Sequence, residues 1–188
     1  MAIQVFGGMG FVEETGIAQH LRDLRIATIY EGTTGIQAND LIGRKILREG
    51  GETLRLLAEE IRGVAGELTA TGDLAELGQA LAADLDRLER TLAWLLDQGE
   101  GEVAQVLAGA VPFLQLLGTL CGAWQMGRAA LVARADLAAA RGDADYLQGI
   151  VELARFYFSH LAPQTEALAR VVTRGGAAVV HTGDAVFG

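Results

Sequence analysis

The sequence predicts an all-α protein, and two observations carry the prediction. Apolar residues, most of them leucine, recur every three or four positions through most of residues 51–174, which is the period of an amphipathic helix. No stretch alternates apolar and polar residues over the length of a strand, and no Asn-Gly or Asp-Gly hairpin turn occurs. With 51% hydrophobic and 21% charged residues, the 188-residue chain is apolar enough to bury a core.

Residues 1–50 have a different sequence pattern from the rest of the chain, because the glycine-rich loops FGGMGF and YEGTTG separate short helical segments. The first loop is not a dinucleotide-binding G-x-G-x-x-G sequence, since Glu13 occupies the last glycine position. Residues 11–27 then predict a helix whose start is favoured by the acidic side chains of Glu13 and Glu14.

The second loop places an acid beside a helix start. Thr34 and Gln37 form a T-x-x-Q capping-box pattern that opens the helix GIQANDLIGRKIL, and Glu31 lies just before it. A helix N-terminus presents free N–H groups that suit an anion such as phosphate. The residues alone therefore leave two interpretations open, an anion pocket with an acid beside it or a glutamate in a capped loop.

Residues 51–174 predict an up-down bundle of about four long antiparallel helices with short connections. The apolar positions of the first two helices, separated by the break TATGD, are Leu54, Leu57, Ile61, Val64 and Leu68, and then Leu74, Leu77, Leu81, Leu85, Leu88, Leu92 and Leu95.

The third helix is expected over about 102–140, with Pro112 either kinking it or lying near its first turns. Four of its glycines are expected to mark close backbone approach rather than breaks: Gly109, Gly118, Gly122 and Gly127.

The fourth helix follows the break RGDAD, where Asp143 is the expected N-cap, and runs to about Thr173 with its hydrogen-bond ladder interrupted at Pro163. The tail 175–188 either docks or is disordered. The predicted apolar stripe of this helix is Tyr146, Ile150, Leu153, Tyr157, Leu161 and Leu168.

Composition argues against several classes of function. A net charge of −9 disfavours nucleic acid and an anionic membrane as the main partner. Residues 103–127 carry no charge and have the length of a transmembrane helix, but their glutamines, proline and glycines favour a buried helix instead, so no integral membrane span is predicted.

The single cysteine, Cys121, excludes an intrachain disulfide and is expected to be a small buried apolar residue. It fits a reducing compartment, and without a secretory signal at the start we expect a cytoplasmic location. None of His20, His160 and His181 has an acid three residues before it, as helical di-metal sites require. No metal site is predicted, and the histidines are expected to be structural or surface residues.

Two segments, 4–11 and 20–37, resemble the end of the catalytic α-domain of flavin-dependent acyl-CoA dehydrogenases. Their sequences are QVFGGMGF and HLRDLRIATIYEGTTGIQ, and the second contains both an RD and an IYEGT motif. The family pattern is Q-x-x-GG-x-G-[YF], then RD-x-x-I, then I-Y-E-G-T-x-x-I-Q. The later helices resemble the extra C-terminal bundle of the larger dehydrogenases, the branch that includes the methylmercaptopropionyl-CoA enzyme.

The resemblance implies a role for each residue of the motifs. Glu31 matches the catalytic base that removes the α-proton of the acyl thioester, with Tyr30 and Gly32 beside the substrate. Gly35 departs from the family, where a larger polar residue is frequent. The residues that the resemblance assigns to FAD are Thr33, Thr34 and Gly35, and, for the FAD of a neighbouring subunit, Gln4, Val5, Phe6, Gly7 and Gly8.

The resemblance also implies an activity, partners and a division of the chain. The parent enzyme would oxidise an acyl-CoA to its 2,3-enoyl-CoA with FAD and pass electrons to an electron-transfer flavoprotein, as a homo-oligomer. Residues 1–50 would end the catalytic α-domain, 51–174 would form the bundle and 175–188 the tail. The helical and β-barrel domains that precede these motifs in the family are not in this sequence, so we expect a C-terminal fragment that is inactive alone.

Two alternatives stay open at this point. The bundle could be a non-catalytic helical assembly module, whose apolar stripes pair between copies. The chain could also come from a relative with the same fold and different chemistry, such as a nitroalkane oxidase or a DNA-damage-response homologue.

Overall fold

The computed structural model describes residues 2–183 and 186, and within them every regular element is a helix, which confirms the all-α prediction. The chain divides into two compact units, Met1–Gln37 and Ala38–Gly188. The first unit contains α1 (Ala2–Val5), the 3-10 helices η1 (Gly7–Gly10) and η2 (Glu13–Thr15), α2 (Ile17–Ile29) and the start of α3 (Thr34–Asp40).

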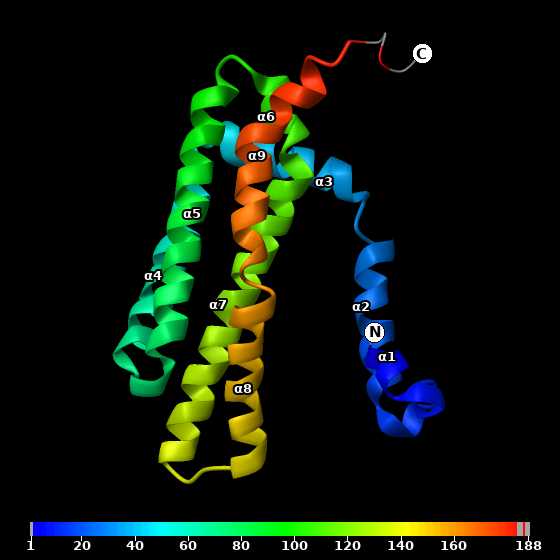
Figure 1. Cartoon of the computed structure of the whole chain (residues 1–188), viewed down its shortest axis with the longest axis vertical. Helices are drawn as coiled ribbons and strands as arrows, with labels where there is room; N and C mark the ends of the chain where they lie inside the picture. The colour runs from blue at the N-terminus through cyan, green and yellow to red at the C-terminus, as the bar shows by residue number, and fades with distance from the viewer. Residues whose placement is uncertain (1, 184–185, 187–188) are drawn as a thin grey trace. The chain divides into compact units, whose positions relative to one another are not determined.

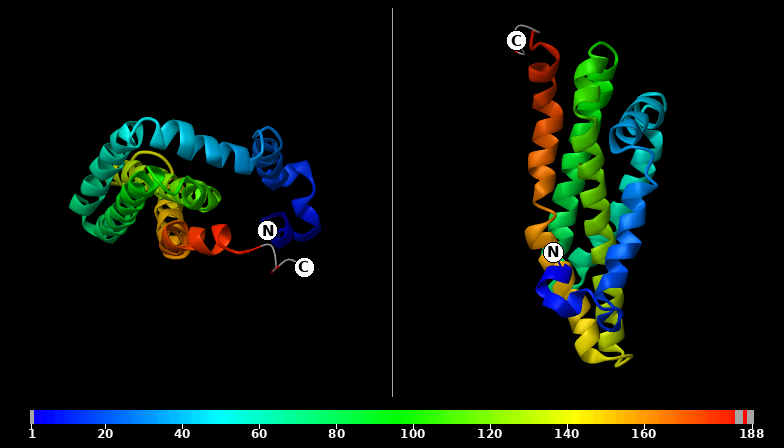
Figure 2. Two further views of the ribbon diagram at one scale, coloured as in Figure 1. Left: turned by 90° about the horizontal axis from the view of Figure 1, so that it is seen from above. Right: turned by 90° about the vertical axis from the view of Figure 1, so that its right-hand side faces the viewer.

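The second unit is an up-down bundle of four rods, as the sequence predicts (Figure 1). Two of the rods consist of two consecutive helices each, α6 with α7 and α8 with α9. The other views show the rods running side by side (Figure 2). After the π-helical turn η3 (Leu41–Leu47), the elements are α4 (Glu52–Ala70), η4 (Gly72–Leu74), α5 (Ala75–Gly99), α6 (Val103–Ala108), α7 (Ala110–Ala138), α8 (Ala144–His160) and α9 (Gln164–Val180).

The core of the bundle is built largely from the leucine stripe of α5 and of the turn before it. All seven predicted leucines are at most 8% exposed: Leu74, Leu77, Leu81, Leu85, Leu88, Leu92 and Leu95. Burial of one such side chain contributes roughly 1.5–3 kcal/mol. These leucines can pack against several helices because α5 contacts α4, α6, α7 and α9.

The helix predicted over 11–27 begins later than expected. Glu13 and Glu14 form a 3-10 turn, and Gly16 at φ 74° separates that turn from α2, which starts at Ile17. The left-handed glycine ends one helical turn before the next begins, so the two acids do not lie at the start of the longer helix.

The third rod is broken, and the predicted continuous helix over 102–140 is wrong. Gly109 ends α6 and precedes α7. A side chain at Gly109 would come within 3.3 Å of Val172 on α9, so this glycine is both a break and a close approach. Pro112 lies in the first turn of α7, where its missing N–H leaves no hydrogen bond unmade.

The fourth rod begins as predicted, because the Asp143 side chain accepts a hydrogen bond of 2.8 Å from the N–H of Tyr146. It divides before Pro163, and α9 continues to Val180 instead of ending near Thr173. The four residues 184–185 and 187–188 of the predicted tail lie outside the described residues.

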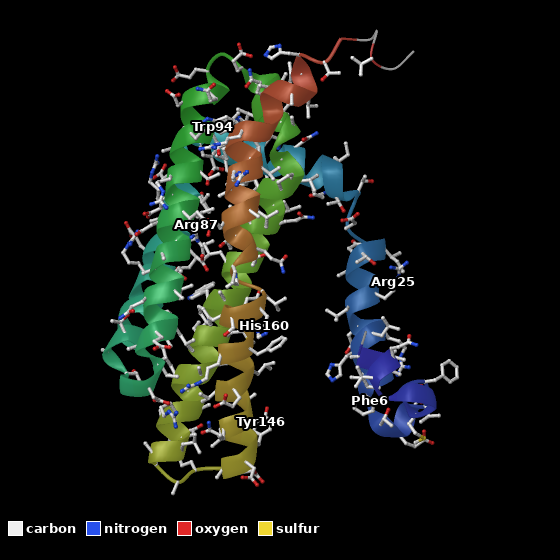
Figure 3. All side chains as sticks on the ribbon, in the orientation of Figure 1. Phe6, Arg25, Arg87, Trp94, Tyr146 and His160 are labelled. Carbon is white, nitrogen blue, oxygen red and sulfur yellow. The ribbon has the colours of Figure 1, made fainter. Side chains whose placement is uncertain are left out.

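The predicted apolar stripe of α8 is correct only in part. Ile150 and Tyr157 pack against the core, whereas Tyr146 is 67% and Leu153 50% exposed. The fully buried residues of α8 are Val151, Ala154 and Phe158, each of which directly follows a residue of the predicted stripe. Figure 3 shows Tyr146 and His160 at the two ends of α8.

Two other glycines of α7, Gly122 and Gly118, differ in how closely a neighbouring helix approaches them. A side chain at Gly122 would overlap the hydroxyl of Tyr157, which donates a 3.1 Å hydrogen bond to the carbonyl of Thr119. Gly118 has open space at the same point, so its predicted role in close approach is wrong. Gly122 therefore sets how closely α7 and α8 pack, and Gly118 does not.

The remaining expectations concern the cysteine, the histidines and the membrane. Cys121 is half-buried, and burial raises the pKa of its thiol. His20, His160 and His181 are exposed, and no group of three or more metal-binding side chains gathers within the described part of the chain. Among the same residues, none of the helices combines the length and the apolar character needed to cross a membrane.

Candidate active site

Glu31 lies in the loop between α2 and α3 and binds the first residue of α3. Its carboxylate accepts a 2.8 Å hydrogen bond from the N–H of Thr34 and bonds of 2.7 and 2.9 Å from the Thr34 hydroxyl. The N–H of Gln37 instead donates to the carbonyl of Thr33 at 3.0 Å. The predicted Thr34–Gln37 capping box is therefore wrong, and an acid occupies the place where an external anion was considered.

The backbone between Glu31 and Thr34 is held in a left-handed conformation. Gly32 has φ 76° and Thr33 has φ 77°. Glycine adopts this conformation without cost, but a β-branched threonine is an outlier there. Such strain, of order 1–3 kcal/mol per residue, concentrates at functional segments. A side chain at Gly32 would lie 2.7 Å from the movable Gln37 amide, so glycine is favoured there by its positive φ and not by this contact.

The side chains beside Glu31 are open to solvent. Tyr30 is 89% exposed, and Glu31 itself is half-buried. A side chain at Gly35 would meet no atom within 4 Å. The loop around Glu31 is therefore exposed to solvent on the side of Tyr30 and Gly35.

The segment Gln4–Gly8 lies at the other end of α2. The helix that begins at Ala2 packs beside the first half of α2, where a pocket of about 340 Å³ is lined by Gln4, His20, Leu21 and four further residues. The pocket extends along α2 as far as Leu24, which leaves about 10 Å of helix and loop between it and Glu31. The structure brings the residues 30–35 together and keeps them apart from Gln4.

His20 and Leu21 are residues of that pocket that the sequence analysis did not place there. The signal was present in the sequence, because Ile17, Leu21 and Leu24 recur with helical spacing on the face of α2 that lines the pocket. The packing partner of that face, α1, was not predicted as a helix.

The backbone around the first glycines fits a group that approaches it closely, as FAD would. No atom lies within 4 Å of a side chain added at Gly7 or Gly8, and Gly7 has φ 58°. The third glycine has a structural role instead, since a side chain at Gly10 would overlap the carbonyl oxygen of Ile3. The donors at Thr34 also suit a cofactor, but Glu31 occupies them here.

The first unit buries almost nothing of its own. Among its described residues only the small Gly10 and Ala18 are buried. Large apolar side chains exposed in this number favour coverage of the first unit by another protein surface. The large apolar side chains that are at least half exposed are Val5, Phe6, Met9, Phe11, Leu21, Leu24, Ile26, Ile29, Tyr30 and Ile36.

Two protein-family models match the chain. Residues 1–47 match the model described as "Acyl-CoA dehydrogenase, C-terminal domain". Residues 57–182 match the model described as "Acetyl-CoA dehydrogenase C-terminal like". Together they cover both the loop with Glu31 and the helical bundle.

Curated relatives extend over the same residues. The 3-methylmercaptopropionyl-CoA dehydrogenase of Ruegeria pomeroyi is 45% identical over 168 residues, which are 89% of this chain and 28% of the relative. The broad-specificity linear acyl-CoA dehydrogenase of Mycobacterium tuberculosis is 32% identical over 99% of this chain and 32% of its own length. A butyryl-CoA dehydrogenase of Syntrophomonas wolfei is 30% identical over 87% of this chain and 27% of its own.

The chain spans less than a third of the length of these relatives, and it matches them through both the glycine-rich motifs and the bundle. The helical architecture agrees with the two family models. The chain belongs to the acyl-CoA dehydrogenase family.

Proposed function

We propose that this chain is the C-terminal part of a flavin-dependent acyl-CoA dehydrogenase and that Glu31 is its catalytic base. The enzyme would oxidise an acyl-CoA to the 2,3-enoyl-CoA. The observation that carries the proposal is the position of Glu31, a half-buried carboxylate on the strained Gly32–Thr33 backbone and at the edge of an uncovered apolar face. Family membership supports the reaction class.

The contact between Glu31 and Thr34 provides a resting position for the base. Both carboxylate oxygens bind Thr34 in this chain, so abstraction of a proton from the α-carbon requires the carboxylate to turn away from at least one of these bonds. Burial by the substrate and by the rest of the enzyme would favour a neutral carboxyl and so a stronger base. Glu31 then holds the α-proton on a carboxylate oxygen.

The same movement would free two donors. Once Glu31 turns toward the substrate, the N–H and the hydroxyl of Thr34 become available to an acceptor beside α3. We propose that Thr33, Thr34 and Gly35 contact FAD there. When bound, FAD supplies the acceptor for the hydride that leaves the β-carbon. Tyr30 and Gly32 would border the substrate on the exposed side of the loop.

A second contact with FAD is proposed for Gln4, Val5, Phe6, Gly7 and Gly8. The helix that carries Gln4 packs beside the first half of α2, away from Glu31, which supports contact with the FAD of a neighbouring subunit and hence a homo-oligomer. The open backbone at Gly7 and Gly8 supports a close approach of that group.

The division of the chain and its surroundings are also proposals. Residues 1–50 would complete the catalytic α-domain and the helices after them would form the bundle, which α9 extends to Val180; the separate family-model matches support this division. Electrons would pass to an electron-transfer flavoprotein. The single cysteine supports a reducing compartment, and we propose the cytoplasm.

Alone, this chain would neither hold FAD tightly nor turn over substrate, because its first unit leaves the side opposite Glu31 uncovered. The absorption spectrum of the purified chain measures this directly. We expect no absorption band between about 350 and 500 nm, the range in which flavins absorb. A yellow protein with that band would contradict the proposal.

The base is tested in the full-length flavoprotein with Glu31→Gln, which keeps the shape of the side chain and removes its basicity. Loss of general-base catalysis lowers the rate of flavin reduction by acyl-CoA about 10²–10⁴-fold while FAD stays bound. Glu31→Asp, the matched control, keeps a carboxylate and part of the rate. Unchanged flavin reduction in Glu31→Gln would move the base to another residue.

A second candidate function is a helical assembly module without catalysis. The bundle exposes some large apolar side chains, with Val132 62% and Phe156 52% exposed, which favours pairing with a second copy. Sedimentation of the isolated chain separates the two candidates. If the chain sediments as a monomer at roughly tens of micromolar protein, where moderate self-association would be seen, the result argues against the assembly role.

A further inference from the structure

Four arginines from two helices line one groove of the bundle. The helices are α5 and α9, which pack side by side, and the groove has a volume of about 270 Å³. Arg87 and Arg90 come from α5, and Arg170 and Arg174 come from α9. Figure 3 shows Arg87 on α5 where that helix faces α9.

This concentration of positive charge runs against the composition of the chain. The net charge is −9, and only 15 residues are lysine or arginine, of which four line this groove. Arg170 and Arg174 lie one turn apart on the same face of α9, and like charges at this spacing destabilise a helix. Glu166, four residues before Arg170, offsets part of this repulsion, and a bound anion would offset the rest.

The arginines of the groove also differ from the others in the bundle. Arg62 pairs with Asp86 and Glu89, and Arg134 and Arg155 both pair with Asp73. By contrast, no ion pair joins a described residue to three of the four groove arginines, Arg90, Arg170 and Arg174. Their guanidinium groups are left to water or to a ligand.

Arg87 is the fixed member of the cluster. It is 24% exposed, pairs with the buried Asp84, and donates a 3.3 Å hydrogen bond to the hydroxyl of Thr165. Its other terminal nitrogen lies 3.9 Å from the exposed Glu166, the one acid that lines the groove. Arg87 is therefore held in place by its own acids, and the guanidinium groups that pair with no described acid and give the groove its net positive lining are those of Arg90, Arg170 and Arg174.

The floor of the groove consists of small side chains. Thr91 and Ala169 are buried, and Thr173 is half-buried. The two threonine hydroxyls donate to the carbonyls of their own helices. Nothing bulky on this floor prevents an anion from reaching the arginines from above.

We propose that this groove binds a phosphorylated small molecule through its phosphate or diphosphate group. Guanidinium groups present paired N–H donors that match the oxygens of phosphate, and they keep their charge at any physiological pH. The volume of about 270 Å³ suits such a group better than an extended acidic peptide. The site involves neither Glu31 nor the glycine-rich loops, so it stands independently of the proposed dehydrogenase activity.

Inorganic pyrophosphate is the probe, titrated into the whole chain by isothermal calorimetry. We expect one saturable site, and Arg170→Gln weakens its binding about tenfold, the loss of one charge-assisted contact. The matched control is Arg48→Gln, which removes the same charge from an exposed arginine that lies outside the groove. Circular dichroism checks that both variants keep the helical content of the parent chain, as expected for exposed side chains.

Three results would overturn the proposal. Pyrophosphate binding without saturation reflects general charge attraction, as does an equal loss in Arg48→Gln and Arg170→Gln. Tighter binding of a hexaglutamate peptide than of pyrophosphate assigns the groove to an acidic protein segment instead.

Discussion

The carboxylate of Glu31 accepts hydrogen bonds from both the N–H and the hydroxyl of Thr34, the first residue of α3. An acid at a helix start satisfies a free N–H and interacts favourably with the helix dipole. The residue proposed as the catalytic base therefore has a structural function in this chain. The two functions use the same oxygens, so they exclude one another at any moment.

Glu31→Ala loosens the first turn of α3. Removal of a capping acceptor costs about 0.5–2 kcal/mol of local stability. Hydrogen exchange of the Thr34 amide measures it, because that N–H loses its partner. Glu31→Gln retains an acceptor oxygen and should have a smaller effect. Equal protection of Thr34 in all three proteins would show that the cap contributes nothing.

Gly10→Ala disrupts the packing of η1 against α1, because a side chain there overlaps the carbonyl oxygen of Ile3. Overpacking of this kind costs about 1–3 kcal/mol. Limited proteolysis of residues 1–29 should accelerate. Gly8→Ala is the matched control, since its side chain would meet no atom within 4 Å. If both variants are cleaved at the rate of the parent chain, the contact with Ile3 does not hold this segment.

Two alanine substitutions in α7 are expected to have opposite signs. Gly122→Ala destabilises the bundle by about 1–3 kcal/mol, because the new methyl group displaces the Tyr157 hydroxyl from Thr119. Gly118→Ala stabilises it by about 0.5–1 kcal/mol, since alanine favours the helix and meets open space. Urea denaturation gives both values. Stabilisation by Gly122→Ala would mean that α7 and α8 are not in close contact there.

Asp84 makes the stability of the bundle depend on pH. The carboxyl group is 7% exposed, and burial raises its pKa despite the hydrogen bond from Thr165 and the charge of Arg87. A raised pKa in the folded state means that this contribution is fully present below the unfolded pKa of about 3.9 and is lost as pH rises through the folded pKa.

The measurement is the free energy of unfolding between about pH 3 and pH 7, a window around the ordinary aspartate pKa. Asp84→Asn removes this ionisation, so the parent chain should lose stability relative to the variant as pH rises. Other carboxylates titrate equally in both proteins and cancel in the difference. Parallel profiles would show that Asp84 does not ionise differently in the folded chain.

Much of the bundle could be predicted because its signals are local or strictly periodic. The α5 stripe repeats a large apolar residue over seven leucines, and the Asp143 cap depends only on the next three residues. On α8 the periodic signal identified Ile150 and Tyr157, which pack against the core, but not the fully buried Val151, Ala154 and Phe158. Each of these three directly follows a residue of the predicted stripe, because the pattern shows the period of a helix more sharply than the centre of its packed face.

For the candidate site, the sequence names candidate residues but does not give their contacts. Sequence order identifies Glu31, but its bond to Thr34 depends on the left-handed backbone of Thr33, which no propensity favours. The arginine groove was missed for another reason. Arg90 and Arg170 are far apart in the sequence, and only the packing of α5 on α9 brings them to one surface.

The most direct test of the central claim is the exchange of the substrate α-hydrogen with solvent. The full-length flavoprotein is incubated with an acyl-CoA in D₂O, using the butyryl and 3-methylmercaptopropionyl thioesters that match the names of its relatives. If Glu31 is the base, deuterium enters the α-position with the parent enzyme and not with Glu31→Gln, while both proteins retain FAD. Equal deuterium incorporation by the two proteins would contradict the assignment of Glu31.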